Sequence, residues 1–259
     1  MGRSARHRCG AVTVWVLAGL FFGAALVYAS VGFGGGSAYL ALLTLAALPV
    51  ADVPVVALVC NVLVVAGGSW QFVRAGHARA RLVVPFLVTS VPAAAIAGAA
   101  LVPVGTLRTV TGIALAAAAV AMTIEVGTRR SVEVEAIPRA RLWTLGAALG
   151  AALGGLAGLI GIGGGIFLAP VLYGLGWGTP KQIAAAASVF ILVNSLAGLA
   201  GKAGAVGALG VAAYAPLFVA VLVGGQIGSR LGARRWSPAT VKRVTAAVVL
   251  VAAVNLLAG

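Results

Sequence analysis

The sequence predicts an all-α, polytopic membrane protein built from two related halves. Hydrophobic residues make up 62% of its 259 residues, charged residues only 8%, and the mean hydropathy is +1.13. Soluble domains do not have this composition. Apolar runs of membrane-spanning length recur along the chain. A glycine-rich break appears once in each half, as GFGGG at Gly32–Gly36 and as GIGGG at Gly161–Gly165.

Five apolar arms are predicted in the first half. Ala11–Val31 extends about 31 Å as a helix, which is enough to span, whereas Ser37–Leu48 extends only about 18 Å. Together they form a hairpin or a broken helix around the first glycine-rich segment, because glycine is costly in a helix interior. Three further spans follow: Val53–Phe72, Leu82–Val102 and Leu107–Ile124.

The same order of features is repeated in the second half. Leu142–Ile160 leads into the second break, and Ile166–Leu175 is the short arm after it. The remaining spans are Ile183–Ala200, Val211–Leu231 and Val241–Leu257.

The two glycine breaks are 129 positions apart, which predicts a duplicated unit. We therefore expect one membrane domain over residues 1–259, with repeat 1 at 11–124, a linker at 125–141 and repeat 2 at 142–257. Each repeat is a glycine-broken hairpin plus three spanning helices. Since three crossings is an odd number, two such repeats in tandem are inverted relative to each other.

Basic residues are distributed unevenly between the predicted loops. If each glycine-rich segment is a hairpin, 13 of the 18 basic residues share one side, against 11 if it is a single crossing. The hairpin arrangement agrees better with the positive-inside rule. It places the basic loops in the cytoplasm and both termini outside. The N-terminal tail with Arg3, Arg6 and Arg8 is basic but lies outside in this arrangement, so it does not follow the positive-inside rule.

The patterns that metal binding, nucleotide binding and catalysis require are not found in this sequence. Two cysteines and two histidines without metal-ligand spacing predict no metal and no cofactor. GIGGG is close to nucleotide-binding loops, but its flanks are of membrane length, and neither the required acid nor Gly-Lys-Ser/Thr follows. No nucleophile–base pair is visible, so an enzyme is not expected. The net charge of +14 lies in short loops, where lipid headgroups rather than nucleic acid account for it.

The two breaks predict an anion site. A half-helix beginning at Ser37 or Ile166 has unpaired backbone N–H groups and a partial positive charge at its first turn. Two such N-termini facing each other at the midplane can hold an anion without an arginine. The predicted substrate-binding residues are Gly34, Gly35, Gly36, Ser37, Asn61, Gly163, Gly164, Gly165, Ile166, Ser188 and Asn194.

Structural roles compete with this interpretation at some positions. Asn61 and Asn194 occupy equivalent places in the two halves, and either a ligand contact or an interhelical hydrogen bond explains them. Glycines with four-residue spacing are interpreted as helix-packing positions: Gly19, Gly23, Gly154 and Gly158.

Two stretches resemble one known family. GLIGIGGGIFLAPVL at Gly158–Leu172 and TPKQIAAAASVFILVNSLAG at Thr179–Gly198 are similar to the second-half signature of the TauE/SafE family of sulfite-exporter-type permeases. GFGGG followed by Asn61 is similar to the first-half copy. The resemblance implies a bacterial inner-membrane transporter of two inverted repeats. Its substrates would be small organic or inorganic anions, often sulfur-containing. One departure is Val55, which stands where the second half has Ser188.

We therefore expect an anion permease or exporter, with sulfite or sulfonates as substrates and alternating access between the halves as mechanism. An anion channel and a membrane scaffold without substrate are the alternatives. The expected partners are the anion and the lipid bilayer, with a homodimer as one candidate assembly. The exact substrate, the direction of transport and the coupling ion stay open.

Overall fold

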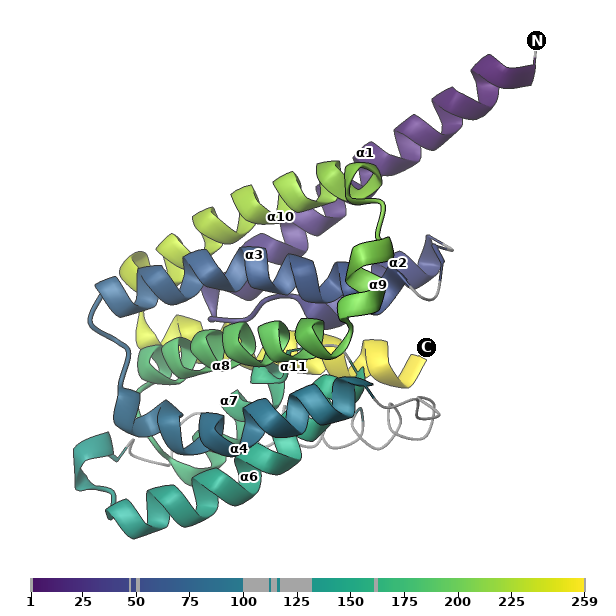
Figure 1. Cartoon of the computed structure of the whole chain (residues 1–259). Coiled ribbons are helices and arrows are strands. Elements are labelled where there is room, and N and C mark those ends of the chain that lie inside the picture. The colour runs from purple at the N-terminus through teal and green to yellow at the C-terminus, as the bar shows by residue number, and fades with distance from the viewer. Residues whose placement is uncertain are drawn as a thin grey trace.

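A computed structural model describes residues 2–46, 48–49, 52–99, 112, 116, 132–160 and 163–258, which form a bundle of helices (Figure 1). Within these ranges the only β-type pairing is an isolated bridge between Val132 and Trp177. The predicted span Leu107–Ile124, apart from residues 112 and 116, and residues 125–131 of the linker lie outside the described residues.

The first half begins with a hairpin of two helices. Its described helices are α1 (Gly2–Ser30), α2 (Gly36–Leu45), α3 (Asp52–Arg74) and α4 (Ala80–Ala99). The Tyr28 hydroxyl lies 3.2 Å from the Ser37 Oγ, and the rings of Phe21 and Tyr39 stack at 4.8 Å. These contacts show that α2 folds back along α1.

The second half has five long or medium helices in the predicted order. They are α6 (Arg139–Ile160), α7 (Gly165–Leu175), α8 (Pro180–Gly201), α10 (Val211–Arg230) and α11 (Pro238–Ala258). Three short elements were not predicted: η2 (Val134–Ala136), α9 (Ala203–Ala208) and the π-helical turn η3 (Leu231–Arg235). Each predicted arm within the described residues is a helix. The largest difference in bounds is at α1, which begins at Gly2 rather than Ala11.

Five of the described helices are long and apolar enough to cross a membrane. They are α3, α4, Arg139–Leu159 of α6, α8, and Val211–Arg235 across α10 and η3. Large apolar side chains, among them Trp15, Trp70 and Ile96, are exposed on the outside of the bundle. An apolar outer surface of this kind is suited to lipid rather than water. The chain is a multi-pass membrane protein.

Corresponding helices of the two halves pack in exchanged pairs. Helix α1 packs along α10, and its counterpart α6 packs along α4, which is the counterpart of α10. The central helix α3 packs against its own counterpart α8, while α2 contacts α3 and α7 contacts α8. Each of the two outer pairs therefore combines one helix from each half.

Glycines allow the close approach of α6 to α4. A methyl group placed on Gly154 would lie 2.7 Å from the Ser90 Cβ, and one on Gly158 would lie 2.9 Å from the Ala94 Cα. Both distances are too short for real contacts. The predicted packing role of Gly154 and Gly158 is confirmed.

In the other outer pair, α1 with α10, the predicted packing role of Gly19 and Gly23 is wrong. A methyl group on Gly19 or Gly23 would have none of the described residues within 4 Å. The close contacts instead come from the opposite helix and the turn after it, at Gly224, Gly228 and Gly232, which lie against the backbone of α1. One helix of a pair is enough to supply small residues, and four-residue spacing does not reveal which helix or which face does so.

The described basic loops gather at one end of the bundle, which we call the basic end (Figure 1). The Lys181 Nζ donates to the carbonyl oxygen of Ala233 at 3.3 Å, and the His77 Nε2 lies 3.1 Å from the same oxygen. The Arg81 guanidinium donates to the carbonyl oxygen of Ile137 at 2.6 Å. The loops that the hairpin arrangement assigns to one side therefore do lie together. Both chain ends lie at the opposite end (Figure 1).

Candidate substrate site

Each glycine break ends in a residue with left-handed backbone. Gly35 (φ 92°, ψ 9°) is the N-cap of α2, and Gly164 (φ 78°, ψ −17°) is the N-cap of α7. Glycine adopts this conformation without steric cost. Because each cap is a glycine, it has no side chain with which to bond the first-turn N–H groups. The helices begin at Gly36 and Gly165, one residue earlier than predicted.

The two breaks meet at one side chain, the buried amide of Asn61 in α3. A methyl group placed on Gly34 would lie 2.8 Å from the Asn61 Cγ, and one on Gly163 would lie 3.1 Å from the Asn61 Nδ2. Asn61 is fully buried. The structure therefore brings Gly34, Gly163 and Asn61 of the predicted set together, although the two glycines are far apart in the sequence.

Helix α8 adds a hydroxyl group that the sequence interpretation did not select. Ser195 is fully buried, and its Oγ has no hydrogen-bond partner among the described residues. A methyl group on Gly163 would lie 2.5 Å from this Oγ and 2.8 Å from the Ile191 Cγ2. The sequence signal that could have identified Ser195 is its i, i+4 relation to Ile191, which places both residues on one face of α8.

Asn194, the counterpart of Asn61 in the second half, is buried in α8. Its Nδ2 donates to the carbonyl oxygen of Phe190, one turn earlier in α8, at 2.8 Å. Its Oδ1 is buried without a hydrogen-bond partner in the described part of the chain. One amide N–H of Asn194 is therefore used within α8.

The two breaks also differ at the residue that follows their last glycine. Ser37 is buried with its Oγ beside the Tyr28 hydroxyl, whereas the equivalent residue, Ile166, buries an apolar side chain. Behind it, Gly165 lies close to α8, where a methyl group would come within 2.7 Å of the Ala187 carbonyl oxygen. The first break thus has hydroxyl groups of its own, and the second receives one from Ser195.

Ser188 lies away from the glycine breaks. Its Oγ is 3.0 Å from the Ser69 Oγ and 3.5 Å from the carbonyl oxygen of Val65. Since Ser69 follows Asn61 by two turns of α3, the two sites are on the order of 10 Å apart along that helix. The structure therefore places Ser188 in a second buried polar cluster rather than beside the amide of Asn61.

No charged side chain of the described residues lies at the junction of the two breaks. Those in the described ranges belong to loops or to the end turns of helices. Partial charges at the helix N-termini, backbone N–H groups, an amide and hydroxyls therefore set the electrostatics there. Such an arrangement can bind a small anion.

The chain is similar to known proteins over almost its whole length. The model of the family described as Sulfite exporter TauE/SafE matches residues 16–256. The probable membrane transporter protein y4hK of Sinorhizobium fredii is 35% identical over 242 residues, which are 93% of this chain and 97% of that protein. No solved structure matches the chain.

Proposed function

This chain belongs to the sulfite exporter TauE/SafE family, and from that premise we propose that it is a secondary transporter of small anions. Sulfur-containing oxyanions such as sulfite and sulfonates are the proposed substrates. The observation that carries the proposal is the meeting of Gly34 and Gly163 at the Asn61 amide. It places the N-termini of α2 and α7 near one point, where an anion would be held between them.

Binding by helix N-termini suits a transporter in two ways. A lysine or arginine at the centre of a membrane-spanning helix costs about 2.5–3.5 kcal/mol on insertion scales, whereas a backbone N–H group is a hydrogen-bond donor without a net charge. The partial charge at a helix N-terminus is also modest, so a bound anion can leave again. A cation would be repelled by the same partial charges, and no carboxylate of the described residues lies there to hold it.

We propose alternating access as the mechanism and an inverted relation between repeat 1 and repeat 2 as its basis. The exchanged packing of α1 with α10 and of α4 with α6 supports the repeat. Rocking of the halves about the two breaks would expose the anion to each side in turn. The basic end faces the cytoplasm of a bacterial inner membrane in this proposal. The protein would move its substrate without changing it chemically.

The test is flux into proteoliposomes that contain the purified protein. Sulfite, a small sulfonate and a small carboxylate are offered one at a time, with sodium and a divalent cation as comparisons. We expect saturable movement of at least one oxyanion. Flux that does not saturate would indicate an anion channel, and movement of a cation with no movement of any oxyanion would contradict the proposal.

A further inference from the structure

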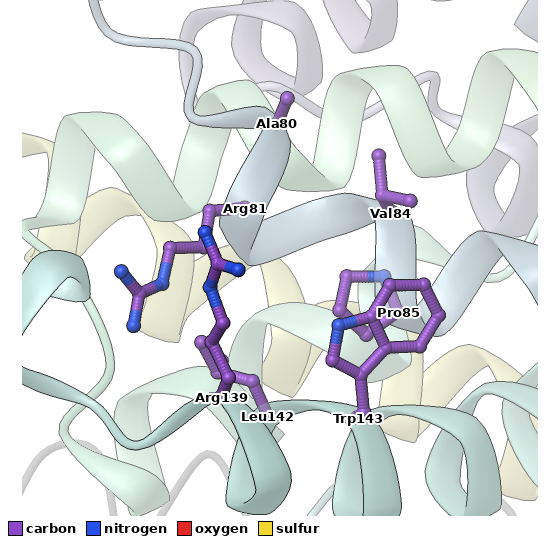
Figure 2. A pocket seen from close by; sticks show the side chains of 7 residues that line it. All are labelled: Ala80, Arg81, Val84, Pro85, Arg139, Leu142 and Trp143. Atoms are coloured by element: carbon purple, nitrogen blue, oxygen red, sulfur yellow. The ribbon is translucent and has the colours of Figure 1, made fainter.

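A pocket at the basic end lies between the first two turns of α4 and the first two turns of α6 (Figure 2), and no residue of the glycine breaks lines it. Its volume is about 370 Å³. Two arginines line one part of it and apolar groups line the rest: Arg81, Arg139, Val84, Pro85, Leu142 and Trp143. Figure 2 shows the two guanidinium groups at one end and the Trp143 ring beside Pro85 at the other.

The charge in this pocket is not neutralised within the described part of the chain. No carboxylate lines it, and the nearby Glu135 pairs with Arg79 instead, at 3.6 Å. Arg81 is held in place by its hydrogen bond to the Ile137 carbonyl oxygen. Its Nε is buried without a hydrogen-bond partner among the described residues. The fixed guanidinium of Arg81 therefore lies at the same end of the pocket as the guanidinium of Arg139.

The apolar part of the pocket includes side chains that are exposed on the surface of the bundle. Val84 is 38% exposed and Trp143 47% exposed, and both belong to helices that can span a membrane. The first turns of such helices lie at the level of the lipid headgroups, where tryptophan is enriched. One turn deeper the pocket is closed, because a methyl group on Gly146 would lie 2.6 Å from the Pro85 Cβ.

We propose that this pocket binds the phosphate-bearing headgroup of an anionic phospholipid. Arginine guanidinium groups bind phosphate oxygens in a bidentate manner, and basic pockets between spanning helices suit anionic headgroups. The outward apolar wall of Val84 and Trp143 would contact the glycerol and the first methylene groups of an acyl chain. A soluble anion would leave that wall without a partner. The inference does not depend on the proposed substrate.

The experiment uses the full chain in phosphatidylcholine bilayers with increasing amounts of brominated phosphatidylglycerol or brominated phosphatidylcholine. Bromine quenches tryptophan nearby, and subtracting the signal of Trp143→Phe isolates the tryptophan in the pocket. We expect half-maximal quenching of Trp143 at a several-fold lower fraction of the brominated phosphatidylglycerol. Arg139→Gln should reduce this preference by about five-fold, and Arg81→Gln together with Arg139→Gln should abolish it.

Arg139→Gln keeps the test valid if the double variant fails to fold, because the Arg139 side chain is exposed. Arg74→Gln with Arg243→Gln is the matched control, since it removes two exposed charges outside the pocket lining, and it should leave the preference unchanged. The proposal is overturned by equal quenching with both lipids, by an equal loss in the control, or by a signal that Trp143→Phe does not change. Loss of the preference on adding soluble glycerol phosphate would show that the pocket takes a free phosphate ester instead.

Discussion

At the scale of single residues, Asn61 connects the two glycine breaks, and its role can be separated from that of a packing residue. An amide that hydrogen-bonds a charged ligand contributes about 1.5–3 kcal/mol. Ser195 has the same relation to the second break, with a hydroxyl in place of the amide. Both side chains lie beside Gly163.

We expect Asn61→Ala to weaken oxyanion binding and transport by about ten-fold or more while the yield of folded protein stays near wild type. Binding is measured by ligand-dependent thermal shift and transport by proteoliposome flux. Gly155→Ala is the control, because a methyl group there has no atom of the described part of the chain within 4 Å. If folded yield and transport of Asn61→Ala fall in parallel, Asn61 is an interhelical tie and not a ligand contact.

His77 gives the basic end a dependence on pH. Burial lowers the pKa of His77, and the charges of Lys181 and Arg79 act in the same direction, against the hydrogen bond to the Ala233 carbonyl. The folded protein therefore binds fewer protons at this site than the unfolded chain, whose histidine pKa is near 6.5. Stability must then fall as the pH drops below that value.

The measurement is the melting temperature of the purified protein between pH 7.5 and pH 5.5. Wild type should lose more stability over this interval than His77→Gln, which can keep a hydrogen bond to Ala233 but cannot be protonated. Parallel pH profiles for the two proteins would show that His77 does not titrate differently on folding.

At the scale of helices, the glycines of α6 set how closely α4 can approach. Gly154→Ala should lower the free energy of unfolding by about 1–3 kcal/mol, because the new methyl group has no room against Ser90. Gly155→Ala, its immediate neighbour, should be neutral or stabilising by up to about 1 kcal/mol, since helix propensity rises and nothing is displaced. Thermal melting in detergent compares the two. Equal stability of both variants would mean that α4 and α6 are less closely packed than described.

The helices were predictable from the sequence because hydrophobic length and glycine breaks are local signals. Asn61 was found in the same way, as a polar residue within an apolar span. Ser195 was missed because its importance depends on which face of α8 meets the second break. Ser188 was grouped with the breaks because neither its rotation about α8 nor its partner Ser69 on α3 can be inferred from spacing alone.

At the scale of the whole molecule, the gathering of the basic loops predicts the orientation in the membrane. Ala136 lies at the basic end and Ala203 at the other, and both are exposed. Cys9 is first replaced by serine. The other native cysteine, Cys60, is buried and should not react. A membrane-impermeant maleimide applied to intact cells should then label Ala203→Cys and not Ala136→Cys. Labelling of Ala136→Cys alone would reverse the orientation.

The exchanged pairing of the outer helices also has a consequence for biosynthesis. When the ribosome has completed α4, neither α1 nor α4 has its partner, because α6 and α10 have yet to be translated. Until then, the backbone surfaces of α4 and α1 that pack against Gly158 and Gly228 are without these partners. The two halves therefore cannot mature one after the other as independent units, and final assembly depends on the last third of the chain.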